Sequence, residues 1–417
     1  MHPKSRISTR LRQAALAITI IGTSVSTYAQ PVAPPASLKD LFDAAWTQQP
    51  ESQALLVRRD AVHAQRRAAE SWTPEPPALE VSKKTDRFNR NSGARELEVG
   101  VAIPLWLPGE RRSSSALADA ETAALESRVE AARLRLAASV REAWWNWQLA
   151  HIDAELARAQ LDSARRIASD VARRAKAGDL ARADQHQADG AVAAAEANVA
   201  QSEAGVSAAL QQLKALSGGV APTSPAGMPH AEPEPASISP TTHPALIELQ
   251  DRATVAERTA ALTARQSRSN PELTLSTTRD RGEFGERYSQ SVTVGIRIPF
   301  GAGPRYDSRV AAARADALEA QAQLALDRSR LQSEQESAVG RVNAARAQLA
   351  AAERRATLAR ETRGFFEKSF RLGETDLPSR LRIEAEATEA ERQAARSRIE
   401  LASAISSWRQ SLGLLPQ

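Results

Sequence analysis

The chain repeats its own pattern at an offset of 194 to 195 residues. At an offset of 194, Pro50 matches Pro244, and at an offset of 195, Gly178 matches Gly373. Most matches involve Pro, Gly and Asp rather than the abundant Ala and Arg, so chance pairing of common residues does not explain them. Each half is therefore expected to build the same structural unit.

The first 29 residues have the pattern of a secretory signal. They contain four basic side chains, then an apolar run too short to span a bilayer, then small residues ending at Ala29. None of the 50 acidic residues and four of the 55 basic residues lie here, so the remaining chain is nearly neutral. The charge balance therefore gives no reason to expect nucleic-acid binding, and we expect export through a cleaved signal.

A proline-rich segment separates the two copies. Seven of the 22 prolines fall between Gly218 and Pro244, which predicts an irregular connector. The expected organisation is therefore a signal peptide at 1–29, a first repeat at 30–217, a connector at 218–242 and a second repeat at 243–417.

Helical patterns dominate both halves. A first helix is predicted from Leu38 to about Ala69, with a counterpart from Pro244 to about Arg265. A much longer helix follows Gly109, with apolar residues alternating at steps of four and three, and a second helix returns alongside it. Ala supplies much of the 42% hydrophobic content, and small Ala side chains favour close approach of neighbouring helices. The long segments therefore predict coiled-coil hairpins of about 100 Å at 1.5 Å per residue.

Two short alternating segments precede each long helical hairpin. Their apolar positions are Leu79, Val81, Leu97, Val99, Val101 and Ile103 in the first half, and Leu273, Leu275, Val292, Val294, Ile296 and Ile298 in the second. Polar residues lie between these positions, and short polar loops join the segments, so each pair predicts a β-hairpin with one apolar face.

Such strands fit either a small soluble sheet or part of a membrane barrel. Strands of roughly 9 to 11 residues span the hydrocarbon core, but four strands cannot close a barrel. An open sheet edge in lipid leaves backbone groups unpaired at several kcal/mol each, so several chains would have to pool their strands. Aromatic residues at the strand ends fit interfacial girdles or ordinary packing: Trp72, Trp106, Phe88, Phe284 and Tyr288.

Taken together, these segments resemble the TolC family of trimeric outer-membrane efflux ducts over essentially the whole mature chain. The resemblance rests on the duplicated element order, on the strand exits from Ile103 to Arg111 and from Ile298 to Gly301, and on the helical tip turns. It implies a mostly α-helical fold with a small β part, in which three chains form a 12-stranded barrel continued by a periplasmic helical tunnel. No Cys is present, so a lipid-anchored N-terminal Cys, found in many relatives, is absent and anchoring would rest on the barrel.

The resemblance also implies the partners of the duct. These are a homotrimer, outer-membrane lipid, a periplasmic adaptor and, through the adaptor, an inner-membrane RND pump. Length and the Gly373-Glu374-Thr375-Asp376-Leu377 sequence are most similar to CzcC-like ducts, which implies cobalt, zinc or cadmium as cargo. A duct for drugs or other small molecules is the alternative, and a periplasmic adaptor or structural coiled coil is a further one.

The residues themselves point to no enzyme and no cofactor. No phosphate-binding Gly loop, serine nucleophile motif or metal-ligand cluster is present. The histidines are scattered and form no pair at helical spacing: His63, His151, His186, His230 and His243.

Two sets of residues are functional candidates. The tip turns of the long hairpins are expected to shape an adaptor contact or a gate, with weak exposed Arg pairs to Asp or Glu linking neighbouring chains. These residues are Arg174, Gly178, Asp179, Leu180, Arg371, Gly373, Glu374, Asp376 and Leu377. Three polar strand residues, Glu96, Glu98 and Arg297, are candidates to face the barrel lumen.

Overall fold

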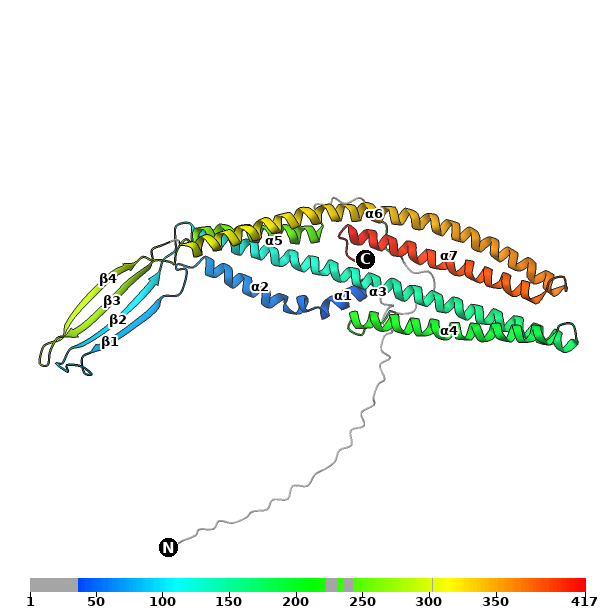
Figure 1. The fold of residues 1–417 in the computed structure, drawn as a ribbon, viewed down its shortest axis with the longest axis horizontal. Helices are drawn as coiled ribbons and strands as arrows, with labels where there is room; N and C mark the ends of the chain where they lie inside the picture. Colours follow the sequence, from blue (N-terminus) through cyan, green and yellow to red (C-terminus); the bar gives the residue numbers. More distant parts are fainter. Residues whose placement is uncertain (1–36, 223–230, 236–242, 302) are drawn as a thin grey trace, which may run out of the picture. The chain divides into compact units, whose positions relative to one another are not determined.

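Both halves of the chain run through the same order of helices and strands. The computed structural model describes residues 37–222, 231–235, 243–301 and 303–417, and the expected signal and much of the connector lie outside these ranges. The first half contains α1 Leu38–Gln48, α2 Pro50–Ala69, β1 Ala78–Thr85, β2 Arg95–Pro104, α3 Glu110–Ala177 and α4 Arg182–Leu216 (Figure 1). The second contains α5 Pro244–Arg265, β3 Glu272–Arg281, β4 Ser289–Arg297, α6 Pro304–Arg371 and α7 Leu377–Ser411.

The single first helix predicted from Leu38 to Ala69 is wrong, because the structure divides it into α1 and α2. Gln49 between them has extended backbone, with φ −70° and ψ 137°. Proline at position 50 disfavours a helical conformation in the residue before it and supplies no N–H for a continuing helix. In the second half Pro244 plays the same part, since it is the first residue of α5.

The four strands form one antiparallel sheet in the order β1-β2-β3-β4, which confirms both predicted hairpins. The two halves meet at the β2–β3 pair, where Val101 lies opposite Leu275. Each hairpin brings its own apolar residues into register, as in the pairs Val81 with Val99 and Leu275 with Val294. Strands β1 and β4 are the two edges of the sheet.

The long helices pack side by side in the order α4, α3, α7, α6 (Figure 1). Helix α3 contacts helices of both halves: α1, α2, α4, α5 and α7. Helix α6 packs against α5 and α7. At 68 residues each, α3 and α6 are about 100 Å long, as the sequence predicted.

The largest apolar core surrounds the middle of α3. There Trp144, Trp145 and Trp147 pack with α1, with Leu213 at the end of α4 and with Ile399 of α7. The buried residues of this core all belong to helices. Aromatic side chains bury large apolar areas, so this cluster ties the short N-terminal helix to both long hairpins.

Among the residues that the structure describes, no helix combines the length and the apolar character needed to cross a membrane.

Candidate functional site

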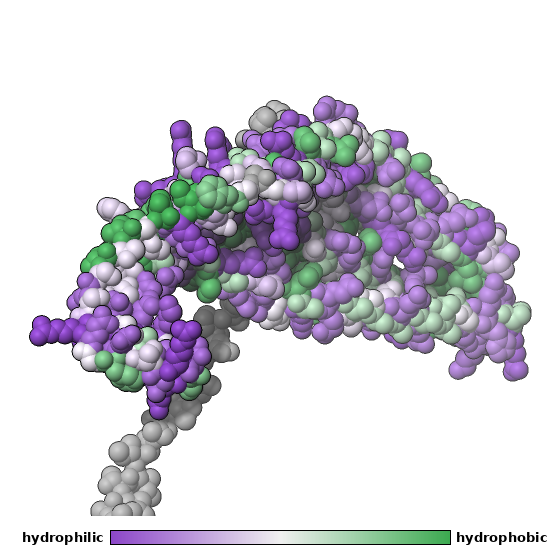
Figure 2. Space-filling model, turned by 60° about the vertical axis from the view of Figure 1, so that its left-hand side comes forward, coloured by the Kyte–Doolittle hydropathy of each residue, from purple (hydrophilic) through white to green (hydrophobic). Residues whose placement is uncertain are grey.

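One face of the sheet is apolar and exposed. Because paired strand residues share a face, the register gathers the apolar side chains of all four strands on it, and Figure 2 shows hydrophobic residues over this part of the molecule. Val294 is 70% exposed and Leu79 is 71% exposed. A contiguous exposed apolar area of this kind marks a surface that meets lipid or protein. We call it the apolar face.

The opposite face, which we call the polar face, carries all three lumen candidates. Glu96 forms an ion pair with Lys84 at 3.4 Å, and Arg297 forms one with Glu272 at 3.4 Å. Glu98 lies in register with Ser82 and Thr278. The acidic residues of this face outnumber the basic ones: Glu80, Glu96, Glu98, Glu272 and Asp280 against Lys84 and Arg297. Each chain therefore presents net negative charge on this face.

Glycine permits both tip turns. Gly178 and Gly373 have φ of +90° and +80°, a conformation that other residues rarely adopt. In each turn the glycine and the residue after it donate backbone hydrogen bonds into the last helical turn: Gly178 to Ala175 and Asp179 to Arg174, Gly373 to Phe370 and Glu374 to Ser369. The two tips are thus the same helix cap built twice.

A cluster that the sequence did not reveal joins the two tips. Phe370 of α6 is 3% exposed and packs with Val171 of α3 and Leu377 of α7. The guanidinium carbons of Arg174 and Arg380 lie 4.9 Å and 5.3 Å from the centroid of its ring. Arg174 also donates to the backbone oxygen of Phe370 at 2.9 Å. We call Arg174, Phe370 and Arg380 the tip cluster.

The other predicted tip residues serve mainly their own hairpins. Arg371 pairs with Glu367 one turn earlier at 3.3 Å. Asp376 accepts from the backbone N–H of Ser379 at 3.3 Å, and hydrogen bonding by the side chain of Ser379 and then by its backbone lowers the pKa of the carboxyl. Leu180 and Leu377 join the apolar core of the tips, whereas Asp179 and Glu374 are exposed. Within the chain, Arg174 binds an aromatic ring and a carbonyl, and the tip arginines do not pair with the tip carboxylates we singled out.

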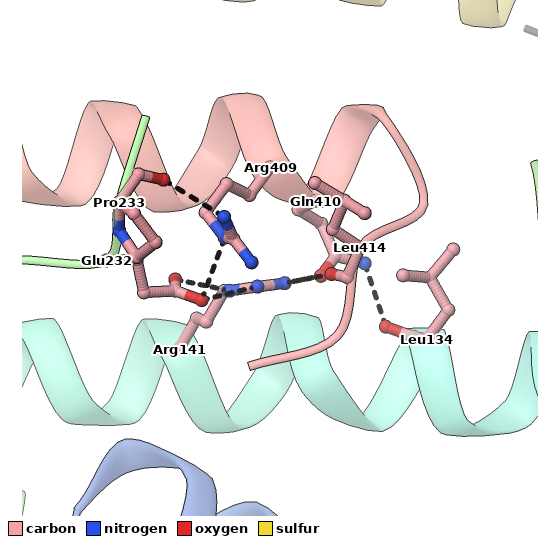
Figure 3. A network of polar contacts seen from close by, with 7 residues as sticks. All are labelled: Leu134, Arg141, Glu232, Pro233, Arg409, Gln410 and Leu414. Carbon is pink, nitrogen blue, oxygen red and sulfur yellow. Dashed lines mark hydrogen bonds and ion pairs between the residues drawn. The ribbon is translucent and has the colours of Figure 1, made fainter. Parts of the chain in front are cut away.

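A buried polar network fastens the connector to both halves. Glu232 is 5% exposed and lies between Arg141 of α3 and Arg409 of α7 (Figure 3). Arg141 donates to both carboxylate oxygens at 2.8 Å, and Arg409 donates to one of them at 3.2 Å. Arg141 also donates to the side chain of Gln410 and to the backbone oxygen of Leu414. One carboxylate therefore holds two helices and the C-terminal turn together.

Burial and charge act in opposite directions on Glu232. Burial by itself would raise its pKa, but the hydrogen bonds and charge of Arg141, with the charge of Arg409, outweigh that effect and lower it. The carboxyl is therefore ionised at neutral pH, as a two-arginine site requires. Sequence reading missed this network, although a charged residue between Val140 and Trp144 in an apolar stretch was a signal.

The described residues contain no group of three side chains that could hold a metal ion. His151 stacks on Trp147 and lies 3.3 Å from Glu155 on the same helix. His243 caps α5, where its Nδ1 accepts from the N–H of Ala245. His230 lies outside the described ranges.

Comparisons with known proteins agree with this architecture. Residues 44–219 match the family model described as "Outer membrane efflux protein". No protein of curated function matches the chain in sequence.

Solved structures match most of the chain. A crystal structure of CusC, described with transmembrane channel formation, is 16% identical with a TM-score of 0.76, and the match covers 91% of this chain and 92% of that one. CmeC, an outer membrane channel of Campylobacter jejuni, is 15% identical with a TM-score of 0.73 and coverage of 97% and 94%. VceC of Vibrio cholerae is 18% identical with a TM-score of 0.71 and coverage of 90% and 96%. The predicted TolC-like fold is confirmed.

Proposed function

We propose that this chain, whose residues 44–219 match the outer membrane efflux protein family, is the outer-membrane duct subunit of a tripartite efflux system. In this role it is exported by a signal at 1–29, and its repeats at 30–217 and 243–417 build one passive conduit. The conduit leads from a periplasmic adaptor and an RND pump to the outside.

The exposed apolar face is the observation that carries the proposal. The sheet has two edges, and in lipid each edge must pair because no water satisfies its backbone groups. Strand β4 runs antiparallel to β1 in a four-stranded antiparallel sheet, so β4 of one copy can pair with β1 of the next in an antiparallel manner. Three copies then close a barrel of twelve strands, an even number within the known range. The apolar face meets lipid and the polar face lines the lumen.

The charge of the polar face favours cations as cargo. Five carboxylates against two basic side chains give each chain a net negative lining, which attracts cations into a pore. This supports divalent metal ions such as cobalt, zinc or cadmium. Drugs and other small molecules, many of them cationic, remain the alternative cargo, and the fold serves either.

The tips are the proposed contact with the adaptor and the proposed gate. Arg174 holds the α3/α4 tip against the α6/α7 tip by one cation–π contact with Phe370, of about 0.5–2 kcal/mol, and one hydrogen bond, while Arg380 stacks on Phe370 within the second hairpin. Links of this size are weak enough to be broken when an adaptor docks. Asp179 and Glu374 are exposed and available to such a partner.

Membrane fractionation tests the duct assignment. The protein should appear in the outer-membrane fraction as a trimer that dissociates on heating, and the purified trimer should conduct ions in a planar bilayer. A soluble periplasmic monomer would refute the proposal. For the cargo, a deletion strain that keeps its zinc, cobalt and cadmium tolerance but loses drug tolerance would favour the alternative.

Single-channel recording tests the gate. Phe370→Leu keeps an apolar side chain but removes the ring between the two arginines, so the open fraction of the channel should rise. Phe365→Leu is the matched control, because Phe365 lies on the same helix and is 68% exposed. Equal open fractions in both variants would remove the tip cluster from the gate.

A further inference from the structure

The two faces of the sheet carry opposite charge. Every charged residue on the apolar face is basic, and all four lie toward the loop ends of their strands: Lys83, Arg95, Arg279 and Arg281. Lys83 and Arg279 both lie opposite Leu97 in the register, and Arg95 lies opposite Arg281 one rung further out. We call these four residues the basic rim. It begins about 7 Å beyond the rung of Val81 and Val99, since two strand residues advance the chain by that distance.

Two cations of the basic rim form neither an ion pair nor a hydrogen bond within the described ranges. Arg95 pairs with Asp86 at 3.3 Å, and Arg281 donates to the backbone oxygen of Gly93 at 3.0 Å. Lys83 and Arg279 are exposed and form no ion pair or hydrogen bond within the described ranges. In the part of the chain that the structure describes, the rim thus holds three charges without a counter-ion beside an apolar surface, and those of Lys83 and Arg279 also lack a hydrogen-bond partner.

An aromatic side chain fixes one of these cations. The guanidinium carbon of Arg279 lies 4.5 Å from the centroid of the Tyr288 ring, and that of Arg281 lies 5.0 Å from it. Stacking on a ring holds the guanidinium plane while leaving its N–H groups free to donate. Arg279 is therefore oriented without being satisfied, as expected of a side chain that awaits an anion.

We propose that the basic rim binds the phosphate-bearing headgroups of anionic lipids. This inference rests on the proposed insertion of the apolar face in a bilayer. Lipid is the occupant that meets both parts of the surface at once, with acyl chains on the valines and a headgroup phosphate one rung further out. Guanidinium groups match phosphate geometry, and a cation near an anionic membrane surface gains about 1 kcal/mol, or about fivefold in binding.

The chain offers a matched control. Lys83 and Arg279 lie on the apolar face, whereas Lys84 and Arg297 are basic residues of the same sheet on the polar face. The test compares wild type, K83Q/R279Q and K84Q/R297Q as full-length trimers in nanodiscs. The discs contain phosphatidylcholine alone or with phosphatidylglycerol, and native mass spectrometry counts the retained lipids.

Wild type should retain phosphatidylglycerol over phosphatidylcholine, and this preference should fall about 20-fold in K83Q/R279Q and weaken with added salt. K84Q/R297Q should keep the wild-type preference. An unchanged preference in K83Q/R279Q, or an equal loss in both double variants, would overturn the inference.

Insertion and conductance in neutral lipid distinguish a failure of this inference from a failure of the duct proposal. A wild-type protein that inserts and conducts in neutral lipid but shows no headgroup preference refutes the basic rim alone. A protein that neither inserts nor conducts in any lipid refutes the duct itself.

Discussion

Helices α3 and α6 are equally long and occupy the same place in the two repeats, yet their surroundings differ. Helix α3 lies among five other helices, whereas α6 packs along its length against α5 and α7 and meets α3 at the tip through Phe370. Large apolar side chains of α6 therefore remain exposed: Leu318, Leu326, Leu358 and Phe365. A duplicated pattern thus yields one helix surrounded by other helices of the chain and one whose large apolar side chains remain exposed.

The same contrast holds at single positions. At the offset of 195, Ala143 and Trp147 of α3 correspond to Ala338 and Val342 of α6, and all four are buried. Arg141, two residues before Ala143, corresponds to Glu336, which is exposed. The buried apolar positions of the long helices are therefore shared by both repeats, whereas the buried arginine of the network occurs in α3 and not at the corresponding position of α6.

The largest effect is expected from breaking that network. Arg141→Met removes the bidentate partner of Glu232 and leaves a buried carboxylate with Arg409 alone, which should cost about 3–5 kcal/mol. Glu336→Gln, at the corresponding position of α6, should change stability by less than about 0.5 kcal/mol. Denaturation of detergent-solubilised protein, followed by tryptophan fluorescence, measures both. Similar losses of stability in the two variants would show that positions 141 and 336 are energetically equivalent.

Leucine truncation tests the packing difference directly. Leu213 of α4 is fully buried against the α3 core, so Leu213→Ala should cost about 3 kcal/mol. Leu358 of α6 is 64% exposed, so Leu358→Ala should cost less than about 0.5 kcal/mol in the isolated chain.

The fraction of trimer reports on contact between copies, separately from the stability of the single chain. Leu358→Glu should leave the fold intact but lower the fraction of heat-sensitive trimer on gels. A trimer fraction equal to that of wild type would mean that this part of α6 faces solvent in the assembly.

Much of this architecture follows from the sequence. The apolar positions of the helices and the alternation of the strands repeat at periods that local geometry fixes. The tip glycines mark helix ends because they adopt positive φ. These elements were therefore predicted within a few residues. Contacts between distant segments have no such period. Phe370 meets Arg174 and Glu232 meets Arg141 only because the hairpins pack in one particular order, and neither pairing has a local pattern. Pro50 indicated a break at Gln49, but the helical patterns on both sides of it favoured a single helix.

Acid sensitivity should distinguish α5 from α2, its counterpart in the first repeat. His243 is the N-cap of α5 and accepts a hydrogen bond through Nδ1, whereas Gln49 in the same position before α2 makes no side-chain cap. Burial lowers the pKa of His243 below 6.5, so its folded form is neutral. Its contribution, about 1 kcal/mol for a cap, is present above pH 6.5 and is lost as the pH falls below that value.

His243→Gln replaces the titrating imidazole with the residue type found before α2, so the step in stability near pH 6.5 should disappear. A second loss should remain below about pH 4.5, because the pKa of Glu232 is lowered and its stabilisation disappears when it is protonated. Melting temperatures measured from pH 7 down to about pH 2 follow both steps, because the second is complete only below the lowered pKa of Glu232. Loss of the step near pH 6.5 in Gln49→Ala instead would contradict the assignment to His243.

The smallest effect is expected where the two hairpins are alike. Arg158 of α3 pairs with Glu203 of α4 at 2.8 Å, and Arg398 of α7 pairs with Glu353 of α6 at 2.8 Å. All four side chains are largely exposed, so Arg158→Gln and Arg398→Gln should each cost about 0–1 kcal/mol, and less at high salt. A much larger cost for one of them would show that the hairpins differ at their surfaces as well as in their cores.

The shared carboxylate of Glu232 has a consequence for how such a protein can be divided. One arginine of the site comes from each repeat and the carboxylate comes from the segment between them. If the gene were cut so that each repeat were made as a separate polypeptide without that segment, each fragment would carry a buried arginine without its counter-ion. The two copies, once fused, therefore became dependent on their junction, and fission back into independent genes is disfavoured.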